Sequence, residues 1–277
     1  MTDIREIAKE LLKKQGWEPS KVEQNLRHKF PDNFSEDNIN LLYRRKNEND
    51  LTQVLDTAVE ELVDFDTQRE EIIDLGFITF DSSFNFQNLF SKIMNSKGVS
   101  FDFARIKKKF DLSGCSLKIP ISFKETNFSE AAIFKHCTME EPFEFCSSIF
   151  EATADFEGLL VKKEIVFDDV RFRSGTSFKS LVCNQEIDFK NNIFNQEADF
   201  SEVRFNERVS FIDNDFQGGV NIDESVFNAQ YPPLFQFKDK DCTLKASNRE
   251  SAKRIKHFMQ QSGDVIGSNK WYAVEME

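Results

Sequence analysis

The segment FNQEADFSEVRFNERVSF, residues 194–211, contains the pattern that decides the expected fold. Its phenylalanines Phe194, Phe200, Phe205 and Phe211 follow one another at steps of six, five and six residues. The same alternation runs over twenty positions without a slip, so the true repeat is one five-residue step followed by one six-residue step. A fixed period of this kind is the sequence signature of a repeat architecture.

These twenty positions are called the ladder below. Sixteen of them hold phenylalanine and the other four hold smaller side chains. The phenylalanines are Phe123, Phe128, Phe134, Phe145, Phe150, Phe156, Phe167, Phe172, Phe178, Phe189, Phe194, Phe200, Phe205, Phe211, Phe216 and Phe227; the others are Met139, Val161, Cys183 and Ile222. The register continues more faintly backwards through Leu117, Leu112, Ile106 and Phe101, and then to Phe90 and Phe84.

A second, smaller residue lies two positions before most ladder residues, as Ile121, Ala132 and Ala198 do. Side chains two apart point to the same side of an extended backbone. Phenylalanines at alternating steps of five and six would instead spiral around a straight α-helix. The pattern therefore predicts short strands with a corner after each, so that every ladder residue stacks on its equivalent in the next coil.

Segments such as Glu197-Ala198-Asp199-Phe200-Ser201 resemble the A(D/N)(L/F)xx consensus of the pentapeptide-repeat family, in its Phe-centred variant. The resemblance is strong over residues 121–227 and weak over 79–120. It implies a right-handed, four-sided parallel β-helix, with the ladder residues and those two before them inside. A coil of four units here combines two five-residue and two six-residue steps, so it is longer than a coil of four plain pentapeptides. We interpret the extra residue of each longer step as a corner bulge.

The expected fold is thus mainly β: a quadrilateral parallel β-helix over 77–232, between a helical domain at 1–76 and a helical cap at 233–277. Pro232-Pro233 is interpreted as the end of the coil, because proline has no N–H for a sheet. Ser247-Asn248-Arg249-Glu250 is a capping box, and Trp271, Tyr272 and Met276 suggest a second helix. This tail resembles a helical hairpin that follows the coil in many bacterial pentapeptide-repeat proteins.

Helical spacing of Ile4, Ile7 and Leu11 supports the first domain, which we interpret as an end cap. The alternative for it is a helix-turn-helix DNA reader with the basic cluster Tyr43-Arg44-Arg45-Lys46. Between Ile121 and Phe227 the chain holds 10 Lys/Arg and 21 Asp/Glu, a balance of −11 out of a net −12. Direct binding of nucleic acid by such an acidic rod is not expected, since phosphate contacts need the opposite sign.

The five cysteines do not form a disulfide pattern. Cys115 and Cys137 occupy the slots two before ladder positions, Cys183 is a ladder residue, and Cys146 follows one. Such placement indicates small core residues, and the odd number favours a reducing cytoplasm. No apolar run approaches the roughly 18 residues of a membrane span, so none is expected within this chain.

No catalytic constellation stands out. His28, His136 and His257 lie far apart in the sequence, and His136 is expected to point outward while Cys137 points inward. Gly218-Gly219 lacks the lysine and hydroxyl residue of a phosphate loop. We therefore expect no enzyme, no cofactor and no metal.

Outward residues just before ladder positions are the candidates for binding a partner. Two columns are polar or acidic and contain Glu144, Asp155, Asp188 and Asp199; two more apolar columns contain Leu160, Val182 and Ile193. The leading hypothesis is a non-enzymatic protein–protein interaction scaffold, with homodimerisation through an end cap or apolar face also compatible. The family resemblance implies an alternative, an acidic DNA mimic that acts on DNA gyrase. A third alternative is the soluble part of a membrane-anchored sensor or channel.

Overall fold

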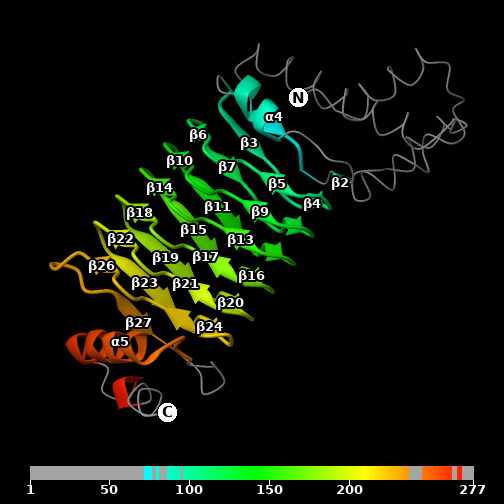
Figure 1. Cartoon of the computed structure of the whole chain (residues 1–277). Helices are drawn as coiled ribbons and strands as arrows, with labels where there is room; N and C mark the ends of the chain where they lie inside the picture. Colours follow the sequence, from blue (N-terminus) through cyan, green and yellow to red (C-terminus); the bar gives the residue numbers. More distant parts are fainter. Residues whose placement is uncertain are drawn as a thin grey trace, which may run out of the picture.

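A computed structural model describes residues 72–76, 79–80, 86–93, 96–236, 245–263 and 267–269. They form a rod of stacked parallel coils, with α4 (Phe86–Lys92) at one end and α5 (Arg249–Gln261) at the other (Figure 1). The expected four-sided parallel solenoid is confirmed. The predictions for residues 1–71, including Tyr43–Lys46, and for Trp271, Tyr272 and Met276 lie outside the described residues.

Four parallel sheets, here A to D, follow one another around each coil. Sheet A contains β1 (Ile72–Asp74), β3 (Gly98–Ser100), β7 (Ile121–Ser122), β11 (Phe143–Cys146), β15 (Ile165–Asp168), β19 (Ile187–Lys190), β23 (Val209–Ile212) and β27 (Leu234–Gln236). Sheet B contains β2 (Thr79–Phe80), β4 (Arg105–Ile106), β8 (Asn127–Phe128), β12 (Ile149–Phe150), β16 (Arg171–Phe172), β20 (Ile193–Phe194) and β24 (Asp215–Phe216).

Sheets C and D are made only of two-residue strands. Sheet C contains β5 (Phe110–Asp111), β9 (Ala132–Ile133), β13 (Ala154–Asp155), β17 (Thr176–Ser177), β21 (Ala198–Asp199) and β25 (Val220–Asn221). Sheet D contains β6 (Ser116–Leu117), β10 (Thr138–Met139), β14 (Leu160–Val161), β18 (Val182–Cys183), β22 (Arg204–Phe205) and β26 (Val226–Phe227).

The coil of four ladder steps is confirmed by the strand register, in which Phe167 pairs with Phe189 and Phe189 with Phe211. The solenoid extends beyond both predicted limits. Before residue 77, β1 already pairs with β3. After Pro232-Pro233, β27 pairs with β23, and Phe235 stacks on Phe211 with ring centroids 4.7 Å apart. The prolines lie in the connection that precedes β27, where no ladder hydrogen bond is required of them, so the predicted end of the coil was wrong.

Ladder side chains fill the interior of the rod, as predicted. Phe178 and Phe200, one coil apart, stack with centroids 4.5 Å apart and planes 7° from parallel. Neighbouring columns meet edge-to-face, as Phe178 and Phe189 do at 5.3 Å and 80°. Both arrangements suit the quadrupole of aromatic rings. Burial of each phenylalanine contributes about 1.5–3 kcal/mol.

Corners of two kinds explain the alternating steps of five and six. Each five-residue step contains one residue with a left-handed backbone, for example Glu125 at φ 52° and Glu202 at φ 58°. The six-residue steps of the ladder, by contrast, include positive φ only at Gly219. The left-handed backbone conformation is therefore a feature of the five-residue corners. The extra residue of the six-residue corners lets the chain turn without that strained conformation.

Both ends of the solenoid are covered. Phe86 and Phe90 of α4 pack on Phe101 with centroids 6.1 Å away, so Phe90 belongs to a helix and not to the repeat. Phe84 lies outside the described residues. The helix α5 begins one residue later than the predicted capping box places it: Asn248 and not Ser247 is the N-cap, and its Oδ1 accepts from the Ser251 N–H at 2.8 Å. This helix buries Ala252, Ile255 and Met259.

Candidate interaction surfaces

The seven predicted partner-binding residues all lie on the outside of the rod, but on four different faces. Sheet A carries Glu144 and Asp188, sheet C carries Asp155 and Asp199, sheet D carries Leu160 and Val182, and sheet B carries Ile193. Since the sheets follow in order around the coil, A lies opposite C and B opposite D. Only Leu160 and Val182 are direct neighbours, and the seven residues do not form one site.

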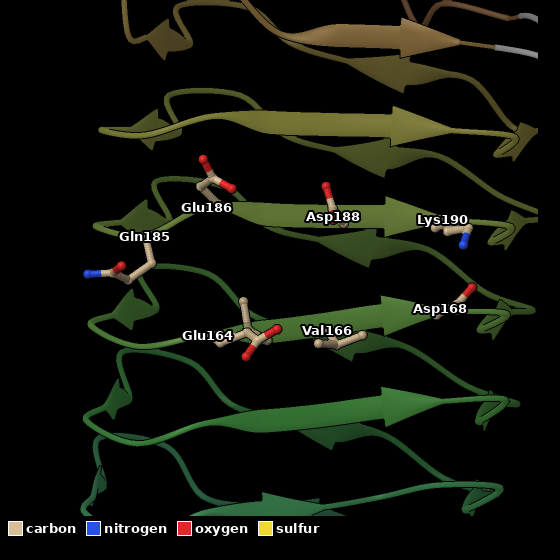
Figure 2. A pocket seen from close by; sticks show the side chains of 8 residues that line it. Glu164, Val166, Asp168, Gln185, Glu186, Asp188 and Lys190 are labelled. Atoms are coloured by element: carbon tan, nitrogen blue, oxygen red, sulfur yellow. The ribbon is translucent and has the colours of Figure 1, made fainter. Parts of the chain in front are cut away.

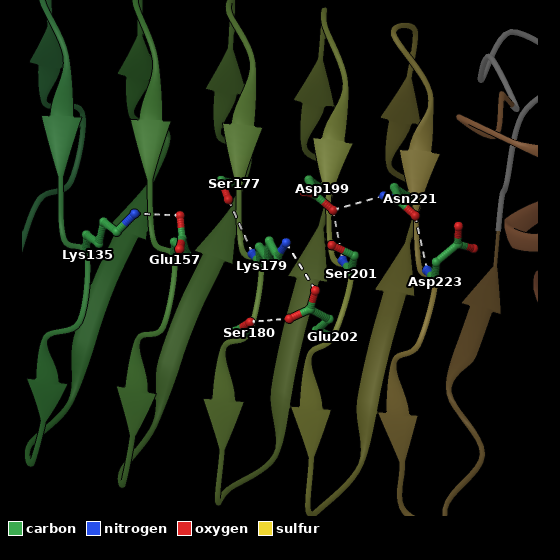
Figure 3. Close-up of polar contacts among 10 residues, drawn as sticks. All are labelled: Lys135, Glu157, Ser177, Lys179, Ser180, Asp199, Ser201, Glu202, Asn221 and Asp223. Atoms are coloured by element: carbon green, nitrogen blue, oxygen red, sulfur yellow. Dashed lines mark hydrogen bonds and ion pairs between the residues drawn. The ribbon is translucent and has the colours of Figure 1, made fainter.

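Acidic residues of sheet C support the corners of the coil (Figure 3). Asp199 Oδ1 accepts hydrogen bonds from the Ser201 N–H at 2.9 Å and from Asn221 Nδ2 at 3.1 Å. Asp155 Oδ1 accepts in the same way from the Glu157 N–H at 2.9 Å. Because a side chain that bonds to the N–H two residues on stabilises a turn, these carboxylates have a structural role.

Ion pairs between successive coils balance part of the charge of the rod (Figure 3). Lys135 Nζ lies 2.7 Å from Glu157 Oε2, and Lys179 Nζ lies 3.0 Å from Glu202 Oε1. The hydrogen bond raises the pKa of Lys135 and lowers that of Glu157. On sheet A, Glu144 is paired with Lys124 at 2.7 Å. Such exposed pairs contribute little stability, but they leave less negative charge for a partner.

Sheet A differs from the other three sheets in the length of its strands. Its strands β11, β15, β19 and β23 have four residues each and are the longest that the structure describes. Two adjacent coils enclose a hollow on this face, called the acidic hollow below (Figure 2). Its lining consists of Glu164, Ile165, Val166, Asp168, Gln185, Glu186, Asp188 and Lys190. The buried Ile165 forms part of its floor, and Val166 is half-buried.

The four carboxylates of the acidic hollow belong to Glu164, Asp168, Glu186 and Asp188, and none forms an ion pair with the residues that the structure describes. Two of them accept neutral hydrogen bonds: Asp168 from Asn191 Nδ2 at 2.9 Å, and Asp188 from the Ser210 hydroxyl. With four carboxylates against the single ammonium group of Lys190, the lining of the acidic hollow carries an excess of negative charge.

Asp188 is the one predicted residue in the acidic hollow; Glu164, Asp168 and Glu186 were missed. Glu164 and Glu186 lie three positions before ladder residues, immediately ahead of β15 and β19, and Asp168 lies one position after a ladder residue, at the end of β15. Glu164 and Glu186 lie four ladder steps apart, and this spacing is the sequence signal that could have indicated their stacking.

A second hollow lies at the α4 end of the same face. Its lining is mostly apolar, with Ile72, Val99, Pro120, Ile121 and Pro142 beside Lys97 and Lys124. Asp102 and Glu144 also line it and balance the two lysines, so sheet A changes from apolar near α4 to acidic in its middle.

Cys137 and Cys183 are buried inside the rod, as predicted, whereas Cys115 is half-buried and Cys146 lies on the outer side of β11 beside Glu144, so Cys146 is not the core residue that was predicted. Cys137 Sγ donates to the Leu112 carbonyl at 2.8 Å inside the rod, whereas His136 is exposed, so the two do not form a dyad. Burial raises the pKa of Cys137 to about 12 and that of Cys183 to about 11. Over the described part of the chain, no three His, Cys, Asp or Glu side chains are grouped so as to hold a metal ion, and no helix is long and apolar enough to cross a membrane.

Cys137 and Cys183 are expected to resist alkylation in the folded protein. At about pH 8 both thiols stay protonated, because their pKa values lie far above that pH and only the thiolate reacts with iodoacetamide. The half-buried Cys115 and Cys146 serve as internal comparison. Peptide mapping by mass spectrometry should find Cys137 and Cys183 modified only after denaturation in urea; rapid modification of either in the native protein would contradict their placement.

Comparison with known proteins gives no assignment, since no protein-family model, no curated protein and no solved structure matches the chain.

Proposed function

We propose that this chain is a non-enzymatic scaffold that binds another protein through the outer face of sheet A. The observation that carries the proposal is the acidic hollow, with four carboxylates that have no ion pair among the described residues. Charge complementarity then favours a partner segment rich in lysine or arginine.

The shape of sheet A supports an extended partner segment. Outward side chains along one of its strands are two residues, about 7 Å, apart, which is also the spacing of alternate side chains in an extended peptide. Asp188 on β19 and Glu186, immediately before that strand, follow this spacing. A peptide laid along that strand would bring two alternate side chains near the carboxylates of Glu186 and Asp188 and the next one near Lys190, while a small apolar side chain would contact Val166.

The proposal includes membership of the pentapeptide-repeat family, of which many members are bacterial. Its support is the ladder, with the four-step coil and the four sheets that follow from it. Unpaired cysteines inside the coil support a reducing cytoplasm as the location.

A triple variant, Glu164→Gln with Glu186→Gln and Asp188→Asn, tests the acidic hollow. Its control is Asp111→Asn with Asp155→Asn and Asp199→Asn on sheet C, which removes the same charge and keeps an amide oxygen for the turn. The probe is a fluorescent peptide of alternating lysine and valine, measured by anisotropy against a glutamate–valine peptide. Three exposed charge contacts are together worth about tenfold in affinity. We expect this loss of affinity for the lysine–valine peptide only in the variant of the acidic hollow. Equal losses in both variants would mean that the overall charge of the rod attracts the peptide, and would contradict a site on sheet A.

A second candidate function, mimicry of DNA toward DNA gyrase, draws its support from the −11 balance of residues 121–227. Supercoiling assays separate it from the scaffold, which predicts no effect on gyrase. Salt-sensitive inhibition that disappears when Glu144, Asp155, Asp188 and Asp199 are changed to Gln or Asn would favour the mimic. The membrane-anchored alternative depends on the tail around Trp271–Met276, which lies outside the described residues.

A further inference from the structure

Successive coils bond to each other in a regular pattern on sheet D. Each strand donates an N–H to a carbonyl of the preceding coil: Arg204 to Leu181, and Val226 to Val203, both at 2.8 Å. The next carbonyl in this series is that of Ser225. In the described chain, no later strand of sheet D donates an N–H to it.

Two further series end at Ile222. On sheet C the ladder N–H donates to the following coil, as Phe200 does to the Asn221 carbonyl at 2.7 Å, and the next donor is the Ile222 N–H. At the corner, a side chain of the following coil donates to the ladder carbonyl where it carries a donor, as Cys137 Sγ does to Leu112 and Ser225 Oγ to Phe200, both at 2.8 Å. The next acceptor is the Ile222 carbonyl, which also accepts from Ser225 Oγ of its own coil at 2.6 Å.

Side chains of α5 form hydrogen bonds with all three of these backbone groups, which are the Ser225 carbonyl, the Ile222 N–H and the Ile222 carbonyl. Ser251 Oγ accepts from the Ile222 N–H at 2.9 Å. Arg254 donates through Nη1 to the Ile222 carbonyl at 2.8 Å and through Nη2 to the Ser225 carbonyl. Each bond repeats one that an additional coil would make, although α5 is a helix.

We propose that Ser251 and Arg254 make α5 a substitute for a further coil, and that this substitution prevents the last coil from pairing with a second copy of the chain. An open strand edge is a template for strand addition, and solenoid ends require a cap. The competing partner is the same end of another copy, because Phe86 and Phe90 of α4 cover the opposite end. Val226, at the last strand of sheet D, is 49% exposed and available to such a contact. This inference does not depend on the proposed partner of sheet A.

The test compares Ser251→Ala/Arg254→Ala with Lys253→Ala in the whole chain. Lys253 is an exposed residue of the same helix, and its contact to Glu250 is a loose 3.8 Å. Hydrogen exchange by mass spectrometry follows residues 220–227, and sedimentation velocity at several concentrations follows self-association. Loss of charge-assisted hydrogen bonds should speed exchange there about tenfold or more.

We expect faster hydrogen exchange at residues 220–227, together with concentration-dependent self-association, in the double variant. Neither effect is expected in the wild type or in Lys253→Ala. Arg254→Lys, which can serve only one of the two carbonyls, should be intermediate. Unchanged exchange at 220–227, faster exchange without self-association, or loss of protection along the whole rod would each overturn the proposal.

Discussion

Replacing Phe200 with alanine is expected to lower the free energy of unfolding by about 3–5 kcal/mol, because a buried phenylalanine leaves a cavity. The Phe200 side chain is fully buried. It stacks on Phe178 at 4.5 Å and meets Phe189 and Phe211 edge-to-face at 5.1 and 5.3 Å. Rings held on three sides cannot move together to fill the space, which favours the upper part of this range.

Asp199→Ala is the matched outward control for Phe200→Ala. It removes the bonds to the Ser201 N–H and Asn221 Nδ2 but opens no interior space. Loss of such a bond costs about 1 kcal/mol. Urea unfolding with a common slope should separate the two variants clearly, and equal shifts of the midpoint would show that the inside and outside of the coil had been exchanged.

Gly218→Ala should destabilise the protein by about 2–3 kcal/mol, through overpacking of backbone against backbone. A Cβ at this position would lie 2.0 Å from the carbonyl carbon of Gln196 in the preceding coil. No side-chain rotation can relieve that contact, so the two coils must separate locally.

Gly175→Ala provides the control, since Gly175 also lies in a six-residue corner between sheets B and C, and nothing lies within 4 Å of its Cβ position. We expect an unchanged or slightly raised midpoint for this variant, because alanine restricts the unfolded chain. Thermal or urea melts that give the same loss for both glycines would contradict the close approach of the coils at Gly218.

The ladder alone was enough to predict the coil, because its period specifies which residues stack. Phe178 and Phe200 are four ladder steps apart in the sequence and one coil apart in the rod. Residues with a left-handed backbone could not be predicted, since positions such as Glu125 and Glu202 are not glycine. Their N–H groups donate to carbonyls of the next coil, Cys146 and Asp223, both at 2.8 Å, and these bonds offset a local preference of about 1–2 kcal/mol.

The candidate site was only partly predictable. Asp155 and Asp199 have the sequence of exposed acids, and nothing in the ladder period reveals that their carboxylates bond to the N–H two residues on. Asp188 was placed correctly on the outside of sheet A. Glu164 and Glu186 were missed because only the residues just before ladder positions were taken as candidates, whereas these two lie three positions before Phe167 and Phe189, immediately ahead of β15 and β19.

Photo-crosslinking from Val166, on the acidic hollow, tests the central claim that sheet A binds a basic partner segment. The matched position is Ser177, on the opposite sheet C. With a photoreactive amino acid at each position, mass spectrometry should locate crosslinks from position 166 in lysine- or arginine-rich segments of one partner, and these crosslinks should fade as salt is raised. Crosslinks to that partner from position 177 but not from 166 would contradict the account.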